Sequence, residues 1–247
     1  MSFLETIVSF YGLLSLTHLF IQINLSHADY LKTRKDEFDA SYHPRIAIVV
    51  PSYNEETKAL RDCVRSCIGQ EYAGKFKIIV VNDGSKDREG FRAINKEFRN
   101  ASSLKKLDGV GKGQKSLAGI HFIDLPKNLG KRHAQKRGFD VVASWADIIV
   151  TIDSDTIVHP HALRYIVQKF KDPTVGATTG DVKALKTRKF LSHLIAGRYW
   201  MAFHQERSAQ SLFGNVLCCS GPLAAYRNVV IQKVKEAYIT QRFLGQW

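Results

Sequence analysis

Two aspartates, Asp153 and Asp155, lie one residue apart, directly after an apolar run over residues 148–152. The run is mostly β-branched and shows no polar alternation, which is typical of a strand buried on both faces. Both carboxylates would therefore lie near the carboxyl end of that strand, where their repulsion is costly unless a cation lies between them. We interpret the pair as a site for a divalent metal ion.

Acidic residues also follow two earlier apolar runs, over residues 45–51 and 75–81. The first run leads to Tyr53 and Glu55, and the second leads to Asp83. In open α/β folds ligands bind at the carboxyl ends of parallel strands, so we expect these residues to line one site. Asp83 is placed to accept hydrogen bonds from a base or a ribose. For the first stretch taken alone, the alternative is a capped turn that binds no ligand.

A basic helix start forms the third part of the predicted site. A short strand over residues 120–125 is followed by Gly130, Lys131 and Arg132. The free backbone N–H groups at a helix start attract phosphate, and the two cations strengthen that attraction. The alternative is a solvated basic face with no ligand.

The elements that would position these residues alternate between strand and helix. The predicted strands cover residues 45–51, 75–81, 120–125 and 148–152, and the predicted helices cover about 57–69, 88–99, 131–144 and 160–170. This alternation predicts an α/β fold in which helices flank a doubly wound, mostly parallel sheet. Beyond these elements we expect a strand over 175–182, a helix over 190–211, a strand and turn over 213–222 and a helix over about 228–243.

Residues 100–119 interrupt this pattern with Ser, Lys and Gly, and predict an exposed loop. Within it, residues 109–116 nearly match the sequence of a phosphate-binding P-loop. Gln114 stands where that motif requires its second glycine, and no apolar strand precedes the stretch, so we reject a P-loop here.

The composition is that of a globular protein, because 45% of the 247 residues are hydrophobic and 24% are charged. A net charge of +13 favours an anionic partner, and a solvated basic surface is the alternative. Nucleic-acid binding has support from charge alone and would need no metal, so we expect no nucleic-acid partner. The four cysteines do not match a secreted disulfide pattern and favour a reducing cytosolic setting, with Cys63 and Cys67 in packing roles.

Residues 3–25 are strongly apolar, and a helix of that length, at about 1.5 Å per residue, would cross a hydrocarbon core of about 30 Å. Lys32, Arg34 and Lys35 follow, which favours a cytosolic location for the rest of the chain. The alternatives are an amphipathic helix on the membrane surface and a core helix. We therefore predict a transmembrane or membrane-associated helix over residues 1–28, a linker over 29–44 and a main domain over 45–247.

Six motifs in this order resemble the processive family 2 glycosyltransferases, most of all the hyaluronan synthases and then the nodulation chitin-oligosaccharide synthases and chitin synthases. The motifs are PSYNE at 51–55, NDGS at 82–85, NLGKRHAQ at 128–135, DSDT at 153–156, ERSAQS at 206–211 and CSGPL at 219–223. The resemblance implies a GT-A-type (Rossmann-like) domain at a cell membrane, facing the cytosol, with UDP-sugar donors, a growing polysaccharide acceptor and lipids as partners.

The resemblance also assigns roles to individual residues. On the donor side, Tyr53, Glu55 and Asp83 would contact the uridine, Lys131 and Arg132 the diphosphate, and Asp153 with Asp155 the Mg²⁺ or Mn²⁺, Asp153 also lying on the ribose-phosphate side. On the acceptor side, the neighbours of the acceptor sugar would be Cys219, Ser220, Gly221, Pro222 and Trp200. In this family an acceptor hydroxyl attacks the anomeric carbon with inversion while a carboxylate base removes its proton.

The sequence departs from the family pattern in two places. Asn82 stands where an aspartate often precedes Asp83. The motif that supplies the catalytic base does not occur before Trp247, so no catalytic residue is assigned, the domain is expected to be incomplete and the chain is expected to polymerise little by itself. The alternatives are a chitin-type synthase and an inactive module that binds UDP-sugars.

Overall fold

The computed structural model describes residues 2–34, 38–99, 117–185 and 189–240. The chain forms two compact units. Unit 1 consists of Met1–Glu37 and Asp181–Cys218, and unit 2 consists of Phe38–Gly180 and Cys219–Trp247. The predicted division at residues 28 and 44 stays a prediction.

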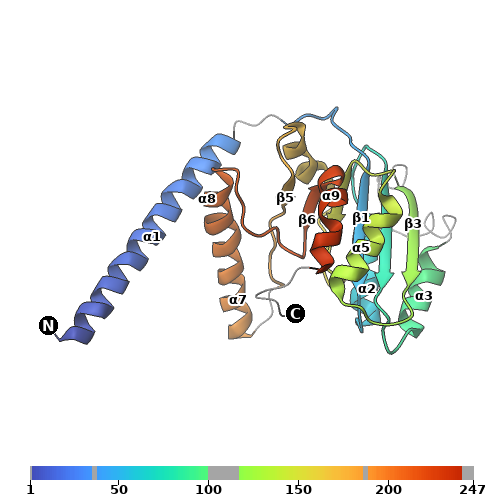
Figure 1. The fold of residues 1–247 in the computed structure, drawn as a ribbon, viewed down its shortest axis with the longest axis horizontal. Helices are drawn as coiled ribbons and strands as arrows, with labels where there is room; N and C mark the ends of the chain where they lie inside the picture. Colours follow the sequence, from blue (N-terminus) through green and yellow to red (C-terminus); the bar gives the residue numbers. More distant parts are fainter. Residues whose placement is uncertain (1, 35–37, 100–116, 186–188, 241–247) are drawn as a thin grey trace. The chain divides into compact units, whose positions relative to one another are not determined.

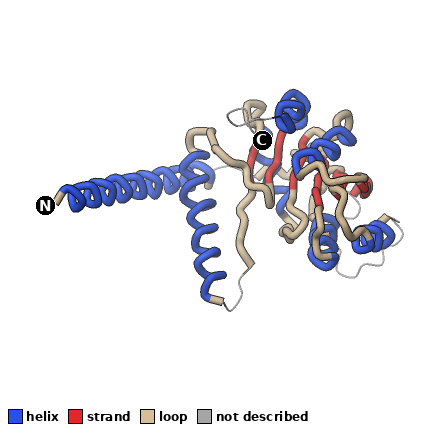
Figure 2. The backbone as a smooth tube through the Cα atoms, turned by 60° about the horizontal axis from the view of Figure 1, so that its bottom comes forward, coloured by secondary structure: helices blue, strands red, loops and turns tan. Residues whose placement is uncertain are grey.

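The described residues of unit 2 form a six-stranded sheet with helices on both sides (Figures 1 and 2). Its strands are β1 Ile46–Ser52, β2 Phe76–Asn82, β3 Leu117–Asp124, β4 Ile148–Thr151, β5 Ala177–Thr179 and β6 Ala224–Arg227. Their order is β3-β2-β1-β4-β6-β5. The first four strands are parallel, whereas β6 runs antiparallel to both β4 and β5. The predicted mostly parallel α/β sheet is confirmed.

Successive side chains of β1 point to opposite faces of the sheet, and they divide the core of unit 2 into two layers. The helices are α2 Thr57–Ile68, α3 Glu89–Phe98, α5 Lys131–Val142, α6 Ala162–Ile166 and α9 Asn228–Thr240, with a 3₁₀ segment η2 over Val167–Lys171. Ile46, Ile48 and Val50 pack in the layer that contains α2, α3 and α6. Ala47 and Val49 pack in the layer that contains α5 and α9. Because both faces are covered, the central strands are apolar at every position, which is the pattern that made them predictable.

The order of the strands also places the site. The chain passes from β1 to β2 and β3 on one side, and then returns to place β4 on the other side of β1. Ligands in open α/β sheets bind outside the carboxyl ends of the strands where such a reversal occurs. In this sheet that point lies between the turns that follow β1 and β4.

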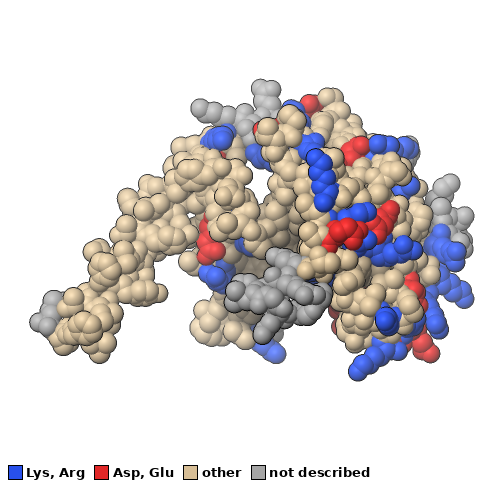
Figure 3. All heavy atoms as spheres, in the orientation of Figure 1, with Lys and Arg blue, Asp and Glu red and all other residues tan. Residues whose placement is uncertain are grey.

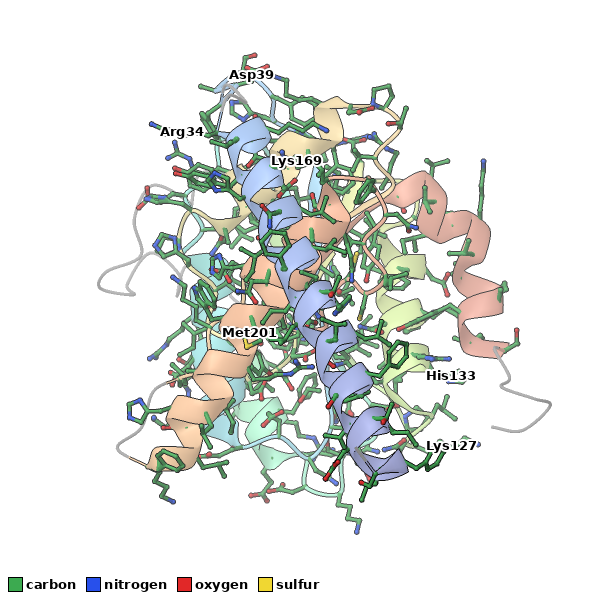
Figure 4. The ribbon with its side chains drawn as sticks, turned by 90° about the vertical axis from the view of Figure 1, so that its left-hand side faces the viewer. Arg34, Asp39, Lys127, His133, Lys169 and Met201 are labelled. Atoms are coloured by element: carbon green, nitrogen blue, oxygen red, sulfur yellow. The ribbon has the colours of Figure 1, made fainter. Side chains whose placement is uncertain are left out.

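Unit 1 contains one long helix and a second, irregular one. The first helix is α1 Phe3–Thr33, and the second is formed by α7 Phe190–Met201, a π-helical segment η3 Ala202–Arg207 and α8 Ser208–Ser211. The helix α1 packs against η3 and α8, and Figure 4 labels Met201 where α7 ends and η3 begins. The Ser208 hydroxyl donates a hydrogen bond of 2.8 Å to the Asp29 carboxylate, which joins α8 to the carboxyl-terminal part of α1.

Among the described residues, α1 is the one helix long and apolar enough to cross a membrane, with a mean hydropathy of 1.5 in a window that is not buried. The visible face of α1 carries almost no charged side chains over most of its length (Figure 3). This finding rests on length and composition alone. The predicted helix is therefore present, and its place in a membrane stays a prediction.

Several predicted boundaries are wrong. No strand forms over residues 213–222, because Gly214 adopts a φ of +66° and the apolar side chains of Phe213 and Leu217 are exposed instead of facing a core. The strand comes later, as β6. The predicted helix over 160–170 is divided into α6 and η2, and the strand over 175–182 is reduced to β5. The predicted loop over 100–119 ends earlier, because β3 begins at Leu117, and the P-loop-like residues 109–116 lie outside the described residues.

Candidate active site

The turn after β1 and the turn after β4 are joined by a side-chain hydrogen bond. Ser154, between the two aspartates, donates from its hydroxyl to Glu55 Oε2 at 2.6 Å. The Ser154 side chain is buried, and Glu55 is partly buried. The structure therefore brings the predicted donor-site residue Glu55 to the predicted metal site. The sequence analysis assigned Ser154 no role, although its place between two aspartates at a strand end was a usable signal.

Asp153 is enclosed on several sides. Lys131 Nζ lies 2.5 Å from Asp153 Oδ1, and the exposed fractions of the two side chains are 53% and 25%. On another side, a Cβ added to Gly221 would lie 3.1 Å from Asp153 Oδ2. The predicted acceptor turn therefore lies directly against the predicted metal ligand, and Gly221 leaves the room that the carboxylate occupies.

A neutral cysteine lies beneath this carboxylate. Cys63 Sγ donates to the backbone oxygen of Asp153 at 3.5 Å. A hydrogen bond with Cys67 and burial raise the pKa of the Cys63 thiol far above its ordinary value, so the thiol stays protonated. Both cysteines are buried in the core, which confirms the packing roles predicted for them.

Asp155 is exposed and has no hydrogen bond or ion pair with any residue that the structure describes. With Asp153 it offers oxygen ligands of the kind that Mg²⁺ and Mn²⁺ prefer. No group of three or more His, Cys, Asp or Glu side chains that could hold a metal ion occurs among the described residues. The pair therefore fits a cation that takes its other ligands from phosphate and water, as Mg²⁺ commonly does.

Asp83 is buried and binds the backbone in front of α5. Its Oδ1 accepts from Leu129 N at 3.0 Å, and its Oδ2 accepts from Gly130 N at 2.8 Å. Gly84, with φ +64°, lets this turn approach the backbone of Lys127 closely. Any other residue would place its Cβ 2.3 Å from the backbone carbon of Lys127. Asp83 thus positions the start of α5, which carries Lys131. Its predicted contact with a uridine stays a prediction.

Arg132 follows Lys131 but engages a different element. Its guanidinium donates to the backbone oxygen of Tyr238 at 3.3 Å and lies 5.2 Å from the centre of the Tyr238 ring. Tyr238 belongs to α9. Of the two cations predicted to face a diphosphate, the structure brings Lys131 to the aspartates, and the role of Arg132 stays a prediction.

The turns after β1 and β2 border a cavity of about 430 Å³ at the carboxyl edge of the sheet, lined among others by Glu55, Asn82, Ser85, Lys86 and Phe91. Asn54 connects the two turns, because its N–H donates to Ser85 Oγ at 2.8 Å and its side-chain oxygen accepts from Lys86 N at 2.9 Å. Tyr53 is 43% exposed beside them.

The predicted acceptor residues divide between the two units. The turn over residues 219–222 is anchored in unit 2 by the N–H of Ser220, which donates to Thr179 Oγ1 at 3.1 Å. Trp200 belongs to unit 1 and is 55% exposed, and its predicted role beside an acceptor sugar stays a prediction. The sequence analysis assigned Thr179 no role, although a small polar residue in a predicted strand was a signal.

Comparison with known proteins gives a consistent result. Residues 47–235 match the model of the family Glycosyl transferase family 2. An N-acetylglucosaminyltransferase of Mesorhizobium japonicum is 35% identical over 204 residues, which cover 82% of this chain and 44% of that protein. A hyaluronan synthase of Streptococcus pyogenes is 36% identical over 240 residues, which cover 96% of this chain and 52% of that protein.

The chain thus spans about half the length of the curated relatives it matches. Among solved structures, a mannosyltransferase of Pyrobaculum calidifontis in complex with GDP-Man and Mn²⁺ has a TM-score of 0.54 at 20% identity. The similarity covers 87% of this chain and 57% of that one. At this identity it shows a shared glycosyltransferase fold.

Proposed function

The chain belongs to glycosyl transferase family 2, and from this premise we propose that it transfers sugars from UDP-sugar donors to a growing polysaccharide in a metal-dependent, inverting reaction. It is related to hyaluronan synthases and to N-acetylglucosaminyltransferases. The observation that carries the proposal is the pair Asp153 and Asp155 at the carboxyl end of β4, joined through Ser154 to Glu55 after β1. This is the point of the sheet at which a nucleotide is expected to bind.

On the donor side the uridine lies against the turns after β1 and β2. Glu55 and Tyr53, in the turn after β1, flank the uridine. Asp83, in the turn after β2, also faces the uridine and positions the start of α5. The diphosphate faces Lys131 and Arg132 at the start of α5, where free backbone N–H groups add to their charge.

Asp153 and Asp155 would hold Mg²⁺ or Mn²⁺ at this site. When bound, the ion supplies positive charge to the diphosphate leaving group. The absence of a side chain at Gly221 leaves room for the Asp153 carboxylate, and Lys131 is its ion-pair partner. A neighbour of similar fold was solved with GDP-Man and Mn²⁺, which supports a nucleotide-sugar and metal site of this general kind.

On the acceptor side we propose that the sugar lies beside Cys219, Ser220, Gly221 and Pro222. The contact between Gly221 and Asp153 supports this, because it brings the acceptor turn next to the reacting end of the donor. The carboxylate base that would accept the proton of the attacking hydroxyl is assigned to no residue of the chain.

We further propose that α1 anchors the protein in a cell membrane, with unit 2 in the cytosol and lipids as partners of α1. The length and apolar composition of α1 support this, as do the cations Lys32 and Arg34 at its end. Positive residues that flank a span favour the cytosolic side.

Calorimetric titration of UDP-N-acetylglucosamine into the full 247-residue chain tests the metal-dependent donor site. We expect binding with Mn²⁺ and a loss of about tenfold or more in affinity with EDTA or in Asp155→Asn, because each change removes the positive charge that the aspartates would hold beside the diphosphate. Asp62→Asn, which removes an exposed pair on α2 at 3.9 Å, is the matched control and should bind as the wild type does. Equal affinity with and without Mn²⁺ contradicts the proposal.

The two groups of relatives favour two donor sets. A hyaluronan synthase-like protein uses UDP-N-acetylglucosamine and UDP-glucuronate, whereas a chitin-type or chitin-oligosaccharide synthase uses the first alone. Since representatives of both groups match at 35% and 36% identity, identity does not separate them. Displacement of UDP-N-acetylglucosamine by UDP-glucuronate at a concentration where UDP-glucose fails would favour the hyaluronan type, and equal failure of both would favour the chitin type.

A further inference from the structure

Lys131 and a divalent metal ion would compete for the same carboxylate. Lys131 Nζ lies 2.5 Å from Asp153 Oδ1, while Asp155 has no such partner among the described residues. We propose that Lys131 is the internal counter-ion of Asp153 in the metal-free protein, and that it weakens metal binding until a donor diphosphate offers its ammonium group another anion. This inference rests on the proposed metal-dependent donor site and adds a rule for the order in which that site is filled.

The surroundings of Asp153 make this competition direct. Gly221 lies against Asp153 Oδ2, with a virtual Cβ at 3.1 Å from that oxygen and 3.3 Å from Oδ1. The backbone oxygen of Asp153 accepts from Cys63 below. Since Gly221 lies on one side of the carboxylate and Lys131 on another, a metal ion that binds Asp153 must approach a carboxylate that the ammonium group already contacts. A cation that binds Asp153 closely would meet the ammonium group at short range, and like charges repel.

The backbone of Lys131 is fixed, although its side chain is free to move. Leu129 and Gly130, directly before α5, donate their N–H groups to the buried Asp83. These two hydrogen bonds fix the backbone at the start of α5, whose first residue is Lys131. The Lys131 side chain is 53% exposed, so its ammonium group has room to leave Asp153 for a phosphate oxygen nearby. Lysine suits this exchange because its flexible stem carries a compact point charge.

The consequence is a coupling between metal and nucleotide. Mn²⁺ alone must displace Lys131 without compensation, so it binds weakly. When UDP is present, Lys131 pairs with the diphosphate, and Asp153 becomes available to the metal. By linkage each ligand then raises the affinity of the other by the same factor. Such a site avoids holding a metal ion without a donor.

Mn²⁺ titration without nucleotide, followed by the electron paramagnetic resonance of free Mn²⁺, tests the proposal on the full chain. In Lys131→Met we expect Mn²⁺ to bind about two- to fivefold more tightly, since the partly exposed ion pair that it must break in the wild type is worth about that factor. UDP binding in the presence of Mn²⁺ should weaken in the same variant, because a phosphate partner is lost. If the Lys131 side chain only stabilised the fold, its removal would not raise the Mn²⁺ affinity while it lowers the UDP affinity.

Three further proteins control this experiment. Lys127→Met removes an exposed cation from the same loop and should leave the Mn²⁺ affinity unchanged. Lys131→Arg retains the charge and should bind Mn²⁺ as weakly as the wild type. In Lys131→Met with Asp153→Asn the gain should vanish, because the carboxylate that was released is absent.

The proposal is overturned if Lys131→Met binds Mn²⁺ no more tightly than the wild type, if neither protein binds it, or if the gain persists without the Asp153 carboxylate. Failure of the proposed function has a different signature, namely UDP that binds equally with and without metal or does not bind at all. The titration with Mn²⁺ alone uses no nucleotide. It therefore tests the role of Lys131 whether or not the protein binds UDP.

Discussion

Asn82, at the end of β2, joins two strand ends through its side-chain amide. Its Nδ2 donates to Asp124 Oδ1 at 2.8 Å, and its Oδ1 accepts from Ser85 Oγ at 2.5 Å. The residue is buried, with 1% of its surface exposed. The sequence showed only a departure from the more common aspartate. The structure supplies a reason, because an amide can donate to Asp124 and a carboxylate cannot.

Asn82→Asp should therefore destabilise the protein by about 1–3 kcal/mol, because it places a buried carboxylate beside that of Asp124 and removes the hydrogen bond between the two side chains. Chemical denaturation at neutral pH measures this. Adding Asp124→Asn should restore most of the loss, since the amide then donates in the opposite direction. A double variant no more stable than Asn82→Asp alone would show that the hydrogen bond is not the cause.

A substitution at Gly221 tests whether the turn over residues 219–222 supports the predicted metal site. Gly221→Ala places a methyl group 3.1 Å from Asp153 Oδ2, so the carboxylate must shift by a few tenths of an ångström. We expect UDP affinity in the presence of Mn²⁺ to fall about tenfold, as is typical when a ligand's support is disturbed. Gly176→Ala, where the new Cβ meets Val230 at an ordinary 3.7 Å, is the matched control in the same calorimetric titration. Equal losses in both variants would point to a general effect on the fold.

At the scale of elements, α5 is fixed at its start by Asp83 and along its length by Asp140. Asp140 accepts from Lys235 of α9 at 2.5 Å and from Lys136 at 3.0 Å. Burial alone would raise the pKa of Asp140, but the hydrogen bonds from Lys235 and Lys136 outweigh it and lower that pKa below its ordinary value. The three side chains are 20–28% exposed, so solvent screens this cluster only in part.

Because the pKa of Asp140 is lowered by folding, the cluster stabilises the protein above the ordinary aspartate pKa of about 3.9 and loses that effect as pH falls through the folded-state value. Asp140→Asn should lower the free energy of unfolding by about 1–3 kcal/mol at pH 7. The difference from the wild type should shrink toward pH 3. Asp62→Asn, with its exposed pair at 3.9 Å, should change stability by less than about 0.5 kcal/mol at either pH. A difference for Asp140→Asn that is independent of pH would contradict this account.

The strands β1, β2 and β4 could be predicted because burial on both faces leaves an unbroken apolar run in the sequence. The error at residues 213–222 has the opposite cause. Val216 and Leu217 are apolar by type, but the neighbour of β4 is set by pairing across the sheet, and the small residues Ala224 and Ala225 occupy that position. A local pattern contains no information about which segment pairs with a distant strand.

The site shows the same division between local and long-range information. Strand order placed Glu55, Asp153 and Asp155 at one edge, because carboxyl ends of parallel strands share it. The hydrogen bond from Gly130 to Asp83 joins residues that are 47 positions apart in the sequence. The ion pair of Lys131 with Asp153 joins residues that are 22 positions apart. Such contacts depend on side-chain reach in the folded sheet and could not be predicted from the spacing of the motifs.

At the scale of the whole molecule, the net charge of +13 is not spread evenly over the chain. Lys and Arg side chains mix with Asp and Glu on the visible face of unit 2, whereas the visible face of α1 is almost uncharged (Figure 3). An apolar helix with flanking cations is typical of a membrane segment rather than of a nucleic-acid-binding surface.

We therefore expect the full chain to sediment with membranes and to resist extraction by high salt. Leu14→Lys with Leu16→Lys, both at exposed positions of α1, should release a large fraction of the protein, because a charge at the centre of a span costs about 2.5–3.5 kcal/mol. Glu56→Ala with Asp62→Ala changes the net charge by the same amount on unit 2 and should stay with the membrane. Release of wild type and control by salt alone would show that α1 is no anchor.

The central claim is that Asp153 and Asp155, with the turns after β1 and β2, form one metal-dependent UDP-sugar site. Anomalous diffraction from crystals of the full chain grown with Mn²⁺ and UDP tests it most directly. We predict a Mn²⁺ peak at coordinating distance from the Asp155 carboxylate and next to the diphosphate, with Lys131 turned from Asp153 to a phosphate oxygen. A Mn²⁺ peak away from both aspartates, or UDP bound with neither aspartate beside its diphosphate, would contradict it.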